Sequence, residues 1–112
     1  MDTYTTFKET KQEPLRLKSA LQGFFSESPE ESAHREEYLR YLKFRIRPAV
    51  EQLILEDAVE KIEELEHLGC FHEKEVEHFI QIAQREGRMI SLMWLLQLKN
   101  EKYGYQDRDF SL

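Results

Sequence analysis

The segment Met89–Leu98 constrains this 112-residue chain most, because eight of its ten side chains are apolar. At about 100° per residue, these eight side chains surround a helix completely instead of forming one stripe. A helix of this kind must be covered on every side, so we expect it to be the centre of the fold or the place where a partner docks. The segment is too short to cross a bilayer, which needs about 20 apolar residues.

The composition predicts an all-α protein. Charged residues make up 34% of the chain and hydrophobic residues 40%, which suits amphipathic helices with solvated outer faces. Four glycines and three prolines provide few turns, which disfavours a fold of many short strands. The expected architecture is about five antiparallel helices, arranged as a small helical bundle or as an α-solenoid-like array of helical hairpins.

Helical periodicity and helix-ending residues place the five predicted helices. Ser28 is a suitable N-cap, Pro29 suits the first helical position, and Glu31 completes the pattern of a capping box. Pro48 must end this helix and can open the next. A second capping-box pattern at Asp57 leaves open whether that next helix is continuous or broken. The predicted helices cover residues 14–25, 28–47, 48–68, 73–86 and 89–103.

The composition of the chain changes at both ends. Residues 1–13 are polar and threonine-rich, so they are predicted to be a flexible N-terminal leader without the apolar core of a secretory signal. Residues 14–104 are predicted to form a single helical domain. Residues 105–112 are predicted to be a C-terminal tail whose aromatic side chains fold back over the helices, and the alternative is a free recognition peptide. The single cysteine, Cys70, excludes an internal disulfide and favours a cytoplasmic protein.

Residues 55–100 contain a repeat-like pattern. A helix that ends in Leu68-Gly69 is followed by a second that ends at Gly87, and then by a leucine-rich helix that ends in Lys99-Asn100. An offset of 33 residues relates Val59, Ile62 and Leu65 to Leu92, Leu95 and Leu98. The segment resembles the degenerate ankyrin-type helical repeats of some bacterial proteins, without their Thr-Pro-Leu-His opening and β-hairpin loop. This resemblance implies an α-solenoid fragment that makes protein contacts, and it identifies no functional residue.

Glu-x-x-His pairs suggest a small helical metalloprotein as an alternative. In carboxylate-bridged di-iron bundles, residues at i and i+3 project together toward the metal. The chain holds eighteen glutamates, so such pairs also arise by chance. The pairs are Glu31 with His34, Glu64 with His67, and Glu75 with His78. The grouping of His67, Cys70, His72 and His78 lacks the spacing of a zinc finger or zincin helix. We therefore expect no catalytic residue, no metal ion and no cofactor.

Basic side chains are concentrated in one part of the sequence. Arg40, Lys43 and Arg47 follow one another at i, i+3 and i+7 with Phe44 beside them, and no acid lies between Arg40 and Arg47. Residues 48–77 carry ten acids and two lysines. We interpret the basic row as a source of favourable electrostatic interactions with the C-terminal end of its own helix and with the acidic segment. Alternatively, it is a docking face for an acidic or phosphate-bearing partner.

These observations favour a small cytoplasmic protein–protein interaction module that has no catalytic activity of its own. The alternatives are the metalloprotein and an accessory protein that binds an acidic or phosphate-bearing partner through the basic row. The expected partner is a protein, and a second copy of the chain is the default because homodimers are the commonest closed assembly. No membrane partner is expected, and the net charge of −6 disfavours nucleic acid. The candidate partner-binding residues are Arg40, Lys43, Phe44, Arg47, Met89, Met93 and Trp94.

A central position for the helix over Met89–Leu98 can be tested by placing a charge in it. If the helix is central, Met93→Asp or Leu96→Asp buries an unpaired carboxylate. Either substitution is then expected to lower the free energy of unfolding by about 4 kcal/mol or more and to unfold the protein. Circular dichroism measures the outcome. A normal helical signal and melting temperature in either variant would show that the helix is not central.

Overall fold

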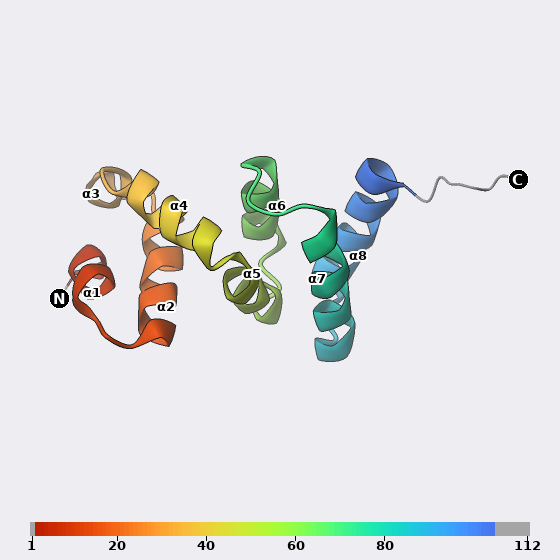
Figure 1. Cartoon of the computed structure of the whole chain (residues 1–112), viewed down its shortest axis with the longest axis horizontal. Helices are drawn as coiled ribbons and strands as arrows, with labels where there is room; N and C mark the ends of the chain where they lie inside the picture. The colour runs from red at the N-terminus through yellow and green to blue at the C-terminus, as the bar shows by residue number, and fades with distance from the viewer. Residues whose placement is uncertain (1, 105–112) are drawn as a thin grey trace, which may run out of the picture. The chain divides into compact units, whose positions relative to one another are not determined.

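The structure is a computed structural model that describes residues 2–104, and these form eight α-helices and a π-helical turn without any β-strand (Figure 1). The prediction of an all-α protein is confirmed, whereas the count of about five helices is wrong. The elements are α1 (Thr3–Glu9), α2 (Glu13–Phe24), α3 (Pro29–Ser32), α4 (Arg35–Phe44), α5 (Ile46–Leu55), α6 (Val59–His67), α7 (Glu73–Glu86), α8 (Met89–Leu98) and η1 (Lys99–Tyr103).

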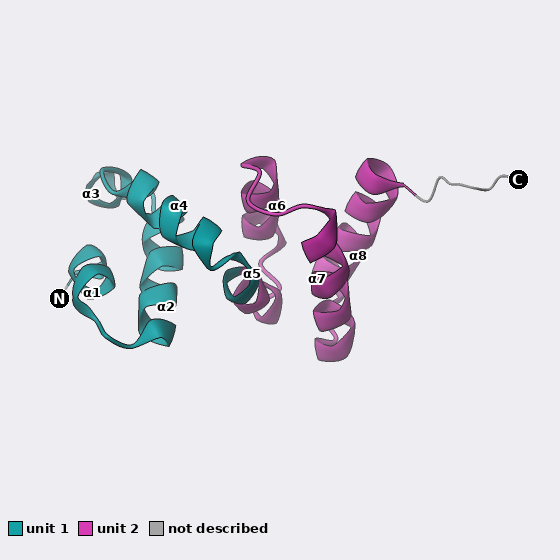
Figure 2. Cartoon of the chain, in the orientation of Figure 1, with its two compact units in different colours: residues 1–49 teal, residues 50–112 magenta. Residues whose placement is uncertain are grey.

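Backbone contacts divide the chain into two compact units, residues 1–49 and residues 50–112 (Figure 2). In the first unit, α2 packs against α1, α3 and α4. In the second unit, α8 packs against α6, α7 and η1. The prediction of one helical domain over residues 14–104 stays a prediction, and the predicted tail at residues 105–112 lies outside the described residues. Within residues 2–104, no helix has the length and apolar character needed to cross a membrane.

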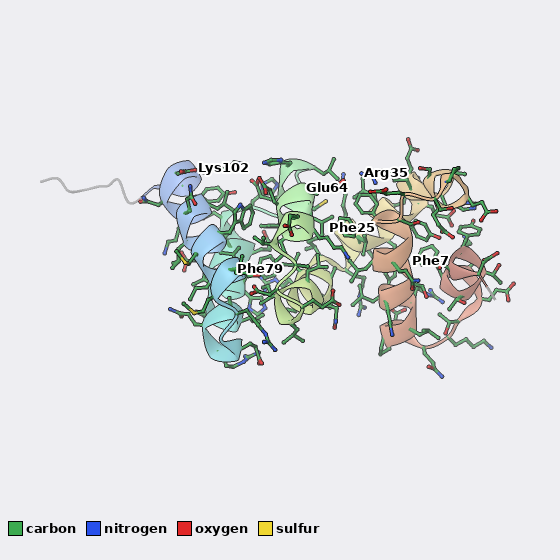
Figure 3. The ribbon with its side chains drawn as sticks, turned by 180° about the vertical axis from the view of Figure 1, so that it is seen from behind. Phe7, Phe25, Arg35, Glu64, Phe79 and Lys102 are labelled. Atoms are coloured by element: carbon green, nitrogen blue, oxygen red, sulfur yellow. The ribbon has the colours of Figure 1, made fainter. Side chains whose placement is uncertain are left out.

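Helix α1 occupies the region that was predicted to be a flexible leader. The carboxylate of Asp2 accepts a hydrogen bond of 2.7 Å from a backbone amide in the first turn and so caps the helix. Phe7 is buried (Figure 3), and its ring lies edge-on to Tyr38 and Tyr41, with centroids 5.1 and 5.3 Å away. A helix of seven residues is unstable alone. These aromatic contacts stabilise α1, and the local threonine-rich sequence does not reveal them.

The predicted helix over residues 28–47 is interrupted in the structure. Ser28 is an N-cap as predicted, because its side-chain oxygen accepts a hydrogen bond of 3.2 Å from a backbone amide of α3. Glu31 does not complete the capping box, since its carboxylate accepts a hydrogen bond from the buried tyrosine of α4. The turn before α4 contains His34, whose ring stacks on Tyr4 of α1 with centroids 3.5 Å apart. This contact is long-range, so helical periodicity does not predict the break.

Asp57 ends the long helix predicted over residues 48–68, so that α5 and α6 are separate helices. Its φ of +53° lies in the left-handed region, which residues other than glycine rarely adopt. Its carboxylate accepts two hydrogen bonds from Ser91 of α8, one from the amide at 2.8 Å and one from the hydroxyl at 2.6 Å. The turn between α5 and α6 is therefore held against the first turn of α8.

The core of the second unit is formed mainly by the inward faces of its helices. Helix α7 has the predicted bounds and ends at Gly87, whose φ of +68° is the left-handed geometry favoured at a helix end. Helix α8 buries one side against its neighbours. The fully buried side chains of this unit include Leu53, Ile54, Ile62, Leu65, Phe71, Val76, Phe79 and Leu95.

Gly23 allows the ring of Tyr38 to approach the backbone of α2. The sequence suggests that this glycine weakens the first predicted helix, but α2 continues through it. The Tyr38 ring is fully buried, and a Cβ atom at residue 23 would lie 2.3 Å from its Cζ atom. The Tyr38 hydroxyl donates a hydrogen bond to Glu31, and burial together with this bond raises the pKa of Tyr38. The glycine is therefore required by packing.

Gly23→Ala tests this close approach. The Cβ atom would overlap the buried ring, and overpacking of this kind costs about 3 kcal/mol at the upper end of its range. The better helix propensity of alanine returns about 1 kcal/mol. We expect the free energy of unfolding, measured with urea, to fall by about 2 kcal/mol. The control is Gln22→Ala at an exposed position of the same helix. A Gly23→Ala protein as stable as the parent would show that the ring is free to move.

Candidate interaction surfaces

Four apolar side chains on the outer side of α8 are exposed. The exposed fractions are 58% for Met89, 61% for Ile90, 66% for Met93 and 39% for Leu96. We call these four residues the α8 face. At 100° per residue, three of them form one stripe at i, i+4 and i+7, and Ile90 lies beside it. The helix carries no charged side chain, so the α8 face is uncharged, and the exposed amide of Gln97 borders it at the C-terminal end of the helix.

The α8 face corrects the prediction that this helix is the centre of the fold. Only the opposite side of α8 is buried, through Ser91, Leu92 and Leu95. The prediction that Met93→Asp unfolds the protein is therefore wrong on structural grounds, because a carboxylate at an exposed position remains hydrated. The sequence pattern also allows a second option for this helix, a place where a partner docks. That option remains a prediction, and the exposure of the four side chains is compatible with it.

Trp94 lies at the edge of the α8 face, next to Met93 and one helical turn after Ile90. It is half-buried and lines a groove of about 340 Å³ between α6 and α8. The buried carboxylate of Glu66, also in this groove, accepts a hydrogen bond of 2.5 Å from Lys102 of η1. This bond raises the pKa of Lys102. Figure 3 labels Lys102. Trp94 therefore lines this groove, whereas the more exposed Met89 and Met93 belong to the α8 face.

Helix α4 presents a second surface, in the first unit. Phe44 is 89% exposed, the highest value among the exposed large hydrophobic side chains of the described residues. Arg40 and Lys43 are exposed as well. Neither cation forms an ion pair within residues 2–104. Two hollows in the surface adjoin these three residues. We call Arg40, Lys43 and Phe44, together with the side chains that line the two hollows, the α4 face.

The two hollows meet at Arg40. The larger has a volume of about 470 Å³, and the smaller one of about 350 Å³. The larger hollow combines aromatic walls with charged side chains and is lined by Phe7, Glu37, Arg40, Tyr41 and Phe44. The smaller hollow is lined by Glu36, Leu39, Arg40 and Lys43. Arg47 lines neither hollow, so the structure brings together only part of the predicted basic row.

An ion pair with Lys8 balances the charge of Glu37, the acid in the larger hollow. The carboxylate of Glu37 accepts hydrogen bonds from Lys8 and, at 2.9 Å, from the hydroxyl of Tyr4. These bonds, of which the one from Lys8 is the stronger influence, lower the pKa of Glu37. The Tyr41 hydroxyl donates to Glu13 at 2.8 Å, and burial with this bond raises the pKa of Tyr41 to about 12. The walls of this hollow are thus held in place by pairs within the same unit.

Two of the histidines, His67 and His78, lie close to acids outside the Glu-x-x-His pairs. The Nε2 atom of His67 lies 3.9 Å from Glu63 and 4.0 Å from Glu66. The Nε2 atom of His78 on α7 lies 2.9 Å from Glu51 on α5, within the second unit. In the described part of the chain, no three histidine, cysteine, aspartate or glutamate side chains are grouped so that they could hold a metal ion.

Sequence reasoning missed the contact of Asp57 with α8 and the contribution of Phe7 from α1 to the larger hollow. Asp57 was assigned to a capping box of its own helix, whereas its carboxylate binds α8 and so holds the helix that carries the α8 face. Phe7 was missed because it belongs to the predicted leader. An aspartate followed by aromatic residues at the N-terminus was the available signal for α1, with Asp2 as its cap.

Comparisons of the chain with protein-family models, with curated proteins and with solved structures found no significant match. Helices α6, α7 and α8 lie within residues 55–100, where the sequence resembles ankyrin-type repeats. That resemblance stays a prediction. A functional proposal for this protein therefore depends on the chemistry of its surfaces.

Substitutions of Asp57 test its hold on α8. Asp57→Ala loses the hydrogen bonds to Ser91 and places alanine at a positive φ, so we expect the free energy of unfolding to fall by about 2 kcal/mol. Asp57→Gly also loses these hydrogen bonds, but glycine adopts a positive φ without strain. Its free energy of unfolding should therefore fall by only about 1 kcal/mol. Urea denaturation measures both. Equal stability of the two variants would contradict a strained turn.

The charge of Asp57 also predicts a dependence on pH. Hydrogen bonds from Ser91 lower the pKa of Asp57 below its ordinary value of 3.8. A carboxyl group with a lowered pKa stabilises the fold above its unfolded pKa, and this contribution is lost as the pH falls through the folded value. The stability difference between the parent and Asp57→Asn should therefore be constant from neutral pH to about pH 5 and shrink below about pH 4. A difference that grows on acidification would contradict this assignment.

Proposed function

We propose that this protein is a helical protein–protein interaction module that binds through the α8 face. The observation that carries the proposal is the exposure of Met89, Ile90, Met93 and Leu96 on one side of one helix. Single exposed apolar side chains are common on protein surfaces, whereas a contiguous group of them is typical of an interaction site. Two of the four are methionines, whose long and flexible side chains adapt to a partner surface.

The α8 face accepts a helix more readily than an extended strand. Its exposed side chains repeat with the period of a helix, and ridges of this kind pack into the grooves of a second helix. The turn at Asp57 holds α8 at its first turn, so the face is presented by a fixed element instead of a loop. A preorganised face loses less conformational entropy when a partner binds.

The occupant that we propose for the α8 face is a second copy of the chain. The face carries no charge, so two identical faces do not repel one another. Antiparallel pairing about Met93 places the two ends of one face opposite the two ends of the other, as a two-fold axis requires. Four side chains bury a small area, and interfaces below about 1,200 Å² are typical of weak complexes. The proposed dimer is therefore weak and depends on concentration.

Sedimentation velocity over a wide concentration range tests the proposal. The parent is expected to shift from the monomer mass of 13.5 kDa toward twice that mass as its concentration rises. Met93→Asp places two carboxylates in the proposed interface and should weaken association at least about tenfold. Its melting temperature at low concentration should stay close to that of the parent, because Met93 is exposed.

The matched control is Leu15→Asp. Leu15 is 39% exposed near the start of α2, outside the α8 face, and a carboxylate near a helix N-terminus is tolerated. This variant should associate as the parent does. A parent that stays monomeric at every concentration, or a Met93→Asp variant that associates equally well, would refute self-association through the α8 face.

A further inference from the structure

The exposure of Phe44 is not explained by the fold. Burial of a phenylalanine side chain stabilises a folded protein, and Phe44 is almost completely exposed at the end of α4. Its ring forms one wall of the larger hollow, with Phe7 and Tyr41 as the other aromatic walls. Three aromatic rings around one hollow provide an apolar contact surface for a side chain that enters from outside.

The charges around the hollow favour an anionic ligand. Arg40 lies between the two hollows and Lys43 lines the smaller one, and neither cation has an ion-pair partner within residues 2–104. Glu37 does not oppose an incoming anion strongly, because Lys8 and Tyr4 already bind its carboxylate. Glu36, in the smaller hollow, is the acid that would oppose it.

We propose that the α4 face binds an acidic segment of a partner protein that carries an aromatic or long aliphatic side chain. The apolar side chain enters the hollow beside Phe44, and carboxylates of the segment lie close to Arg40 and Lys43. The charge complementarity steers the segment toward the face, and the aromatic walls provide the contact area. This site belongs to the first unit and does not rest on the proposed function of the α8 face.

A polypeptide suits the α4 face better than a nucleic acid does. The two cations are accompanied by Glu36, and the chain carries a net charge of −6, which opposes the approach of a polyanion. Nucleic-acid sites normally neutralise several phosphates with a larger set of basic side chains. An exposed ring can stack on a base, so an oligonucleotide is included in the test.

The experiment selects random peptides from a display library on the full chain. Peptides that also bind the double variant Arg40→Glu/Lys43→Glu are removed by counter-selection. The remaining peptides are expected to combine aspartate or glutamate with at least one aromatic or long aliphatic residue. An enriched peptide is then labelled with fluorescein, and its affinity is measured by fluorescence anisotropy at two salt concentrations.

Single variants separate the charges from the hollow. Phe44→Ser should lower the affinity for the enriched peptide about tenfold, and the double variant should lower this affinity further. Glu36→Gln removes a negative charge that repels the acidic peptide, so the affinity should rise about twofold. A variant that failed to fold would lose affinity instead. Lys18→Glu makes the same kind of charge change at an exposed site on α2 and should leave the affinity unchanged. Met93→Asp should also leave it unchanged, since that residue belongs to the second unit.

Three results would overturn the proposal. One is a selection that yields no peptide dependent on Arg40 and Lys43, or that yields basic peptides. Another is an affinity that Phe44→Ser and Glu36→Gln do not change while circular dichroism shows both variants folded. The third is tighter binding of a single-stranded deoxythymidine oligonucleotide than of the enriched peptide, with the same dependence on Arg40 and Lys43, which would assign the face to nucleic acid.

Discussion

The two hydrogen bonds from Ser91 to Asp57 are the interaction on which the surface of α8 depends. A helix that is apolar all round has no strong preference for the side that it buries. Its one serine near the start needs a partner when it is buried, because an unsatisfied amide or hydroxyl in the interior is costly. Asp57 supplies that partner from a left-handed turn that also separates α5 from α6. The side with Ser91 is therefore inside, and Met93 on the other side is exposed.

In the first unit, too, one contact determines which side of a helix is buried. The Tyr38 ring lies against the backbone of α2 at Gly23, and this approach fixes the inward side of α4. Arg40, Lys43 and Phe44 then remain outside. In both units, a surface suited to binding is presented because the opposite side of the same helix is held by one close polar or steric contact.

The two surfaces differ in chemistry and belong to different units. The α8 face is apolar and uncharged, so it suits an identical copy or another apolar helix. The α4 face combines aromatic walls with two cations that have no ion-pair partner within residues 2–104, and the occupant that we propose for it is an acidic segment with an apolar side chain. The two proposals together describe a protein that joins two partners. Their binding can be measured separately, because each surface has its own substitutions.

From the sequence alone, local patterns determined the all-α class, the bounds of α7, the N-cap at Ser28 and the basic, aromatic and apolar residues that carry the candidate surfaces. These features depend on periodicity, capping and composition, which neighbouring residues encode. The tertiary structure decided the formation of α1, the breaks at His34 and Asp57, and the side of α8 that is buried. Each of these depends on a contact between residues far apart in the chain: Tyr4 with His34, and Asp57 with Ser91. Helical periodicity cannot specify such contacts, because it describes one helix at a time and not the partner against which that helix packs.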